Sequence, residues 1–201
     1  DAFFEDFDRV VFYGAGMGGY GAAAFAVAAP GSTVLALAPL STLDTGMAEW
    51  DRRFMAARRL DFTARFGFAP DMIEACERVF VVYDPIQQVD AVHAAMFRGP
   101  HVSRLRARHI GRDPQAELAR VNVLRPLIDA ACTGTLDPAR FYRLWRARRN
   151  NAHYLGRLIG RIQTMKRPAL LLRALRVANG LVDHPQLRQA LERVEAGQPL
   201  R

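Results

Sequence analysis

The chain has 201 residues, of which 50% are hydrophobic, and its formal net charge at neutral pH is +8. Such a chain can bury one sizeable core, and the composition excludes collagen-like, disordered and disulfide-stapled proteins. Its apolar stretches are shorter than the roughly 20 residues that a bilayer requires, so we expect no membrane span. The only cysteines, Cys76 and Cys132, lack the spacing of a zinc site or a disulfide framework. We therefore expect no metal, no cofactor and a cytoplasmic protein.

The first part of the chain predicts alternating strands and helices. Short apolar runs predict four strands, at 9–13, 33–38, 78–83 and 101–107. Alanine-rich or periodic stretches predict helices at 18–29, 71–76, 88–97 and 113–131. Successive strand–helix units predict an α/β domain with a parallel sheet over residues 1–134.

The rest of the chain predicts helices alone. Helical periodicity is present at 138–149, 152–165, 168–179 and 185–196. We expect an all-helical extension over residues 135–201, whose helix spacing of about 16 residues is close to half a tetratricopeptide period. The two halves also differ in charge. Residues 1–100 contain 8 basic and 13 acidic side chains, a net charge of −5, whereas residues 101–201 contain 20 and 7, a net charge of +13.

A glycine-rich turn, YGAGMGGY at residues 13–20, joins the first predicted strand to the first predicted helix. Gly14, Gly16 and Gly19 satisfy the G-x-G-x-x-G pattern of a phosphate cradle. A nucleotide site also needs an acidic residue at the end of the second strand to hold the ribose, and the first acid there is Asp44, beyond the strand. Nucleotide binding is therefore the weaker interpretation. The stronger one is a nucleophile elbow, G-x-S-x-G, in which Gly16 replaces the serine.

The elbow is followed along the chain by VLALAPLSTLD and EWDRRF, and then by VVYDP and VDAVHAAM. Together these stretches resemble a bacterial subgroup of the α/β-hydrolase superfamily over roughly residues 3–131. The resemblance implies the C-terminal half of a hydrolase sheet. Because the chain begins with Asp1 rather than methionine and the N-terminal strands of the family are absent, we expect it to be part of a longer protein.

The resemblance also maps the three catalytic positions of the family. The nucleophile position is Gly16, the acid position is Asp84 or alternatively Asp90, and the base position is Arg112. Glycine has no nucleophilic atom, and arginine does not lose its proton near neutral pH. The resemblance therefore implies a pseudoenzyme with a binding or assembly role.

An alternative keeps hydrolase activity with displaced groups. Ser41 follows the second predicted strand, and His109 lies three residues before Arg112, so Ser41, His109 and Asp84 could together hydrolyse an acylated glycan or a small ester. In the simpler interpretation Ser41 is a turn residue and His109 a surface residue. We expect His93 to be a packing or surface residue rather than a metal ligand.

Residues 140–176 contain 11 cations and no acidic residue, interleaved with aromatic side chains. Such a surface attracts polyanions, here nucleic acid, an anionic glycan or lipid headgroups. The alternative is an ordinary solvated face of arginine-rich helices. The residues expected to bind a polyanion are Arg143, Arg146, Arg148, Arg149, Arg157 and Arg161. In addition, a first strand without a partner at the edge of the sheet predicts a homodimer.

Overall fold

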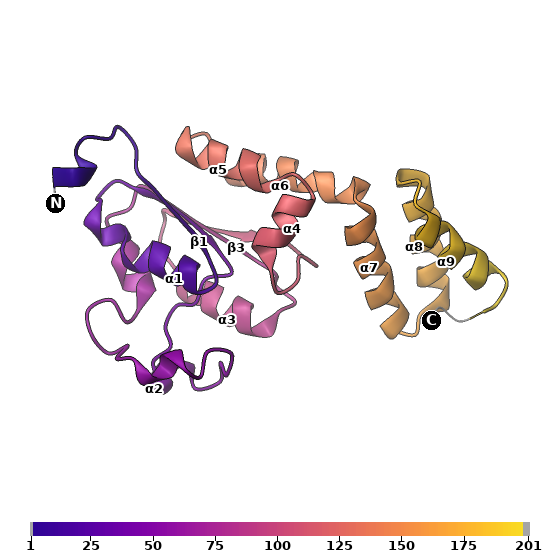
Figure 1. Ribbon diagram of the computed structural model, residues 1–201, viewed down its shortest axis with the longest axis horizontal. Coiled ribbons are helices and arrows are strands. Elements are labelled where there is room, and N and C mark those ends of the chain that lie inside the picture. Colours follow the sequence, from indigo (N-terminus) through magenta and orange to yellow (C-terminus); the bar gives the residue numbers. More distant parts are fainter. Residues whose placement is uncertain (1, 199–201) are drawn as a thin grey trace. The chain divides into compact units, whose positions relative to one another are not determined.

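The computed structural model describes residues 2–198 and confirms the predicted fold class, a parallel α/β sheet followed by helices (Figure 1). The four strands lie in the order β1-β2-β3-β4, and each pair is parallel. The strands are β1 (Val11–Ala15), β2 (Thr33–Leu37), β3 (Arg78–Tyr83) and β4 (Val102–Arg106). β1 starts two residues later than predicted and continues to the glycine turn. All four strands therefore end at one carboxyl edge.

The segments that connect the strands cover one face of the sheet. Crossovers between neighbouring parallel strands are right-handed, which places successive connections on the same side. These connections include α1 (Met17–Ala24), the 3₁₀ helix η4 (Ala69–Ile73) and α3 (Gln88–Met96). They pack on apolar side chains of the strands in a continuous core that includes Ala23, Val34, Ile73, Val81 and Phe97. Shorter helices in the same part of the chain are η1 (Ala2–Phe4), η2 (Ala26–Ala28), α2 (Thr45–Ala48) and η3 (Ala57–Arg59).

After β4 the chain crosses to the opposite face, where α5 contacts β1 and β2 (Figure 1). This region contains α4 (Pro114–Arg120), α5 (Leu124–Cys132) and α6 (Pro138–Trp145). The sequence predicted one helix over 113–131, and this is wrong. Asn122 has a φ angle of 57°, a left-handed conformation that ends α4 before α5 begins.

The chain divides into two compact units, the first ending at Leu144 and the second beginning at Trp145. Helix α6, expected in the extension, therefore belongs almost entirely to the first unit. The second unit contains η5 (Arg146–Asn150), α7 (Ala152–Thr164), α8 (Pro168–Leu181) and α9 (Pro185–Glu195). Helix α8 packs against both α7 and α9. Within residues 2–198, no helix combines the length and apolarity needed to cross a bilayer.

Candidate functional site at the carboxyl edge of the sheet

The turn between β1 and α1 is held in an unusual backbone conformation. Gly16 has φ 55° and ψ −118°, a combination that strains residues with a Cβ atom. Its N–H donates to the carbonyl oxygen of Leu37 at 2.9 Å, which fixes the turn against β2. A Cβ atom at Gly14 would overlap the carbonyl of Gly18, whereas a Cβ atom at Gly16 would meet nothing within 4 Å. Gly14 is therefore required for close packing, while position 16 faces open space.

That open space belongs to a cavity of about 290 Å³. Its walls come from the ends of β1 and β2, the segment after β2, α3 and the start of α4. Two arginines and two aspartates supply its charges. The residues used below are Gly16, Arg53, Asp90, Arg112 and Asp113. Arg53 is committed to Asp90 through an ion pair of 2.6 Å, whereas Arg112 is exposed and makes no ion pair within residues 2–198. Arg112 thus places at this cavity a positive charge that no ion pair within residues 2–198 neutralises.

Asp84, at the mapped acid position, is almost completely buried and accepts hydrogen bonds from two backbone amides. Its Oδ1 accepts from the N–H of Ile86 at 3.0 Å, and its Oδ2 accepts from the N–H of Gly111 at 3.1 Å. These bonds attach the loop after β4 to the end of β3. The same loop carries His109, with φ 64°, and Arg112. Asp84 therefore positions the loop on which Arg112 lies.

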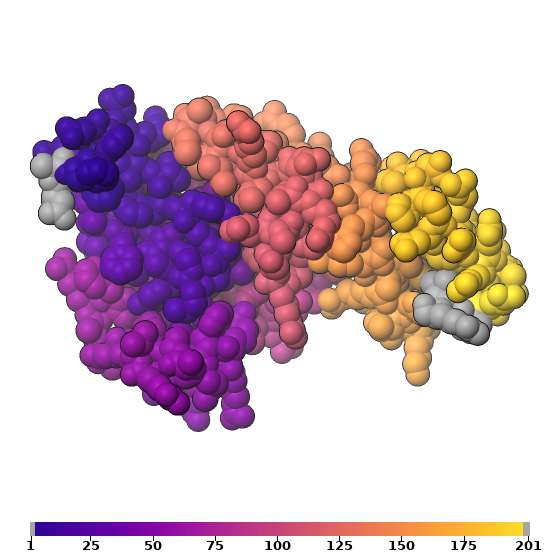
Figure 2. All heavy atoms as spheres, in the orientation of Figure 1, coloured from indigo at the N-terminus to yellow at the C-terminus, as the bar shows by residue number. Residues whose placement is uncertain are grey.

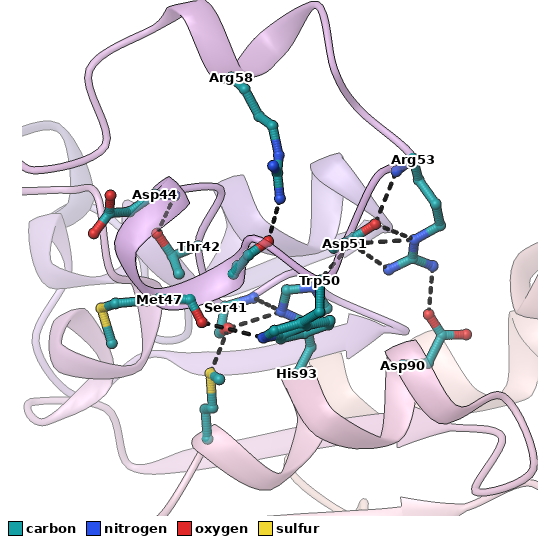
Figure 3. Close-up of polar contacts among 12 residues, drawn as sticks. Ser41, Thr42, Asp44, Met47, Trp50, Asp51, Arg53, Arg58, Asp90 and His93 are labelled. Carbon is teal, nitrogen blue, oxygen red and sulfur yellow. Dashed lines mark hydrogen bonds and ion pairs between the residues drawn. The ribbon is translucent and has the colours of Figure 1, made fainter.

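The segment after β2 contains a buried network that the sequence did not predict. Ser41 Oγ lies 2.8 Å from His93 Nδ1, and His93 Nε2 lies 2.9 Å from Asp51 Oδ2 (Figure 3). Ser41 and His93 are each 0% exposed, and Asp51 is 1% exposed. The structure thus brings Ser41 together with His93 and Asp51, whereas the sequence pattern groups Ser41 with His109 and Asp84.

Arg53 extends this network to Asp90. Its guanidinium donates to both carboxylate oxygens of Asp51, at 2.9 to 3.2 Å, and to Asp90 Oδ1 at 2.6 Å. Burial acts to raise the pKa of Asp51, but the hydrogen bonds from Arg53 and His93 outweigh it and lower that pKa to about 2. Burial raises the pKa of Asp90, although its hydrogen bond and ion pair with Arg53 act to lower it. Burial lowers the pKa of His93, although its hydrogen bond to Asp51 acts to raise it.

The hydrogen bonds define the protonation of His93. The backbone N–H of Ser41 donates to His93 Nδ1 at 3.0 Å, and because an amide can only donate, Nδ1 carries the lone pair. The proton of the neutral ring is therefore on Nε2 and is donated to Asp51. In a serine triad Nε2 receives the proton of the serine and Nδ1 faces the carboxylate, so the ring here has the opposite orientation.

The Ser41–His93–Asp51 part of the network is also closed to solvent, whereas the Arg53 side chain is 40% exposed. The Trp50 ring lies 4.7 Å from the His93 ring (Figure 3). The Ser41 hydroxyl has a second contact, 2.9 Å to Met96 Sδ. Trp50 belongs to the segment between β2 and β3, which appears in purple at the lower edge of the first unit (Figure 2). In this conformation the network holds the segment on α3 and offers no nucleophile to a substrate.

Part of this network was visible in the sequence. Asp90 and His93 are three residues apart on α3, a spacing that places both side chains on one helix face. Asp51 and Arg53 are two residues apart in EWDRRF. The missing information was the pairing of His93 with Asp51, because these residues are 42 positions apart.

The predicted polyanion-binding residues do not form one equivalent set. Arg143, in the first unit, is exposed, as are Arg146, Arg149 and Arg161 in the second. Arg148 instead lies with its guanidinium carbon 5.0 Å from the centre of the Trp145 ring and donates to the Trp145 carbonyl at 2.5 Å. Arg157 is half-buried. Arg148 and Arg157 are therefore less available to a polyanion than the other four.

Comparison with known proteins identifies no matching family model, no matching curated protein and no matching solved structure. Among residues 2–198, no group of three or more histidine, cysteine, aspartate or glutamate side chains could hold a metal ion. The geometry of the carboxyl edge is therefore the basis for a functional assignment.

Proposed function

We propose that this chain is a non-catalytic protein with an α/β-hydrolase-like scaffold, which binds a small ligand in the cavity beside Gly16. The observation that carries the proposal is the backbone of Gly16. Its φ of 55° and ψ of −118° aim the absent side chain into open space at the end of a parallel strand. A hydrolase elbow exposes its nucleophile at such a turn. Here the turn is present and the nucleophilic atom is absent.

The four charges that line the cavity sum to zero, and the one arginine among them without an ion pair in residues 2–198, Arg112, favours an anionic ligand. Arg53 is already neutralised by Asp51 and Asp90, and Asp113 caps α4 by accepting from the N–H of Ala116 at 2.9 Å. Arg112 is the cation left for a ligand. A guanidinium binds carboxylate and phosphate groups through paired hydrogen bonds, so the ligand class is a small carboxylate or phosphate compound.

Nuclear magnetic resonance can test this binding directly. We expect inorganic phosphate or acetate to shift the amide signals of residues 16–19 in the full chain. Arg112→Ala should abolish these shifts, because it removes the charge that holds the anion. Arg104→Ala, which removes an exposed arginine of β4, should leave them in place. Shifts that persist in Arg112→Ala would count against the proposed anion site.

The non-catalytic part of the proposal has a separate test. A fluorophosphonate probe should fail to label the protein, and p-nitrophenyl esters should not be turned over above the background rate. Gly16→Ser with Arg112→His would restore two mapped catalytic positions and tests the origin of the turn. Labelling of that double variant at position 16 would support a hydrolase ancestry.

The second candidate is a hydrolase that acts on an acylated glycan or a small ester through displaced groups. The distances of 2.8 Å from Ser41 to His93 and 2.9 Å from His93 to Asp51 favour it. It requires Trp50 and its segment to move away, because Ser41 is completely buried. Fluorophosphonate labelling that is lost in Ser41→Ala and kept in Ser103→Ala would show that Ser41 is a reactive nucleophile and would overturn the non-catalytic assignment.

A further inference from the structure

Helix α8 has two neighbouring apolar faces, of which only one is used for packing. Leu171, Leu175 and Ala178 are buried in the second unit. The adjoining face carries Leu170, Val177 and Leu181, which are 40%, 56% and 48% exposed. Their spacing of seven and four residues places them along one line of the helix. An exposed row of large aliphatic side chains along one helix face is a candidate interaction surface.

Four cations lie in the chain near the N-terminal end of this row. Arg161 lies in the last turn of α7, Lys166 and Arg167 form the α7–α8 turn, and Arg173 lies on α8. All four are exposed and make no ion pair with another residue of the described range 2–198. By contrast, Arg176 is paired with Glu195 at 2.9 Å. The positive charge is therefore available at the α7–α8 end of the row.

The same end exposes a further apolar side chain. Met165 is 47% exposed, and every residue from 164 to 170 is exposed. The turn thus combines Met165 and Leu170 with Lys166 and Arg167 on one short segment. We call this turn and the row of Leu170, Val177 and Leu181 the α8 surface.

We propose that the α8 surface binds peripherally to a lipid bilayer that contains anionic headgroups. This inference concerns the second unit and is independent of the proposed anion cavity. A nucleic acid or a glycan would satisfy the cations but would leave Leu170, Val177 and Leu181 against polar groups. A bilayer interface satisfies both parts, because its acyl region accepts aliphatic side chains and its anionic headgroups attract lysine and arginine.

Vesicle co-sedimentation of the full chain tests the proposal. We expect binding to phosphatidylcholine vesicles that contain about a quarter phosphatidylserine, and little binding to pure phosphatidylcholine vesicles, because each cation near an anionic surface strengthens binding about fivefold. Binding should weaken as salt is added. No binding to the phosphatidylserine vesicles at low salt would overturn the proposal.

Two variants separate lipid binding from general charge. Reversing Lys166, Arg167 and Arg173 to glutamate should weaken vesicle binding about 100-fold or more, from the loss of three cations. The matched control reverses Arg52, Arg59 and Arg104, three exposed arginines of the first unit that make no ion pair within residues 2–198, and should bind nearly as well as the wild type. Equal weakening in both variants would mean that net charge alone acts, and would overturn the site.

A double variant, Leu170→Ser with Val177→Ser, tests the apolar row of the α8 surface. Because both side chains are exposed, circular dichroism should show an unchanged fold. We expect weaker vesicle binding with unchanged retention on heparin, since the cations remain. Unchanged vesicle binding by the variant would overturn the proposal, because the apolar row would then play no part. Binding of the wild type to heparin or an oligonucleotide, without binding to vesicles, would identify a simple polyanion surface and would also overturn it.

Discussion

Gly14 and Gly16 lie two residues apart in one turn, but the absence of a side chain has a different reason at each. At Gly16 the cause is the backbone angle, since φ is 55° and the space is open. At Gly14 the cause is contact with the carbonyl of Gly18. Gly16→Ala should therefore lower the free energy of unfolding by about 1 to 3 kcal/mol, the usual strain of such a conformation. Gly14→Ala should lower it by more, because the turn itself must move. Urea denaturation of both variants measures the two losses of unfolding free energy, and equal losses would contradict the expected order.

His93 gives the buried network a pH dependence whose sign can be stated. Burial holds the pKa of His93 below its usual value, so the unfolded chain binds a proton at a higher pH than the folded chain. The contribution of His93 to stability is therefore complete above about pH 6.5 and decreases as the pH falls below that value, by at most about 1.4 kcal/mol per pH unit.

Denaturation at pH 7 and pH 5.5 compares the wild type with His93→Gln. We expect the wild type to lose more unfolding free energy than the variant between these two pH values, because glutamine cannot bind the proton. The other histidines are the same in both proteins, so their contributions cancel in the comparison. A variant with the same loss as the wild type would show that His93 is protonated equally in both states.

At the scale of single residues, the sequence indicated the turn better than the network. Gly16 was recognisable because the motif is local and lies between a strand and a helix. The role of Asp84 in holding Gly111 and the pairing of His93 with Asp51 depend on contacts between distant segments. No periodicity within one element contains that information.

Elements were predictable where one local signal was strong. The predicted bounds of β3 at 78–83 agree with the structure, because a run of large apolar residues lies between charged residues. The helix expected at 71–76 is the 3₁₀ helix Ala69–Ile73 instead, with Pro70 in its first turn. The break at Asn122 was missed because apolar periodicity continues through it and only the backbone angle reverses.

Helix α7 contains two exposed glycines that its packing does not require. A Cβ atom at Gly156 or Gly160 would meet nothing within 4 Å, and both residues have ordinary helical positions. Glycine in a helix interior costs about 0.5 to 1 kcal/mol relative to alanine. Gly156→Ala and Gly160→Ala should each stabilise the second unit by about this amount, measured by urea denaturation. Gly134→Ala is the contrasting control and should destabilise, because φ is 66° and its Cβ would meet Arg9.

At the scale of the whole molecule, the two edges of the sheet differ. The outer strand β4 carries Arg104 and Arg106, and charged side chains on an edge discourage pairing with another strand. β1 has the sequence VFYGA, with no charge and no proline. Within residues 2–198, β1 pairs only with β2. The edge formed by β1 is therefore the one suited to a further strand.

The hydrogen bonds at the two ends of β1 show which backbone groups face outward. The carbonyl of Val10 accepts from Thr33 and the N–H of Gly16 donates to Leu37, both at 2.9 Å. Groups that bond to a neighbouring strand alternate along a parallel strand, so those of Val11 and Tyr13 point away from β2. Where no other strand covers this edge, we expect the chain to form a homodimer by pairing these groups with a second copy of β1.

Val11→Pro tests that dimer with little change to the fold. Proline is tolerated at the first residue of a strand, and here it removes an N–H that points away from β2. We expect the wild type to elute as a dimer in size-exclusion chromatography with light scattering, and Val11→Pro as a monomer. Val11→Ala, which shortens the side chain and keeps the N–H, should remain a dimer. If Val11→Pro and Val11→Ala behave alike, the backbone edge of β1 does not form the interface.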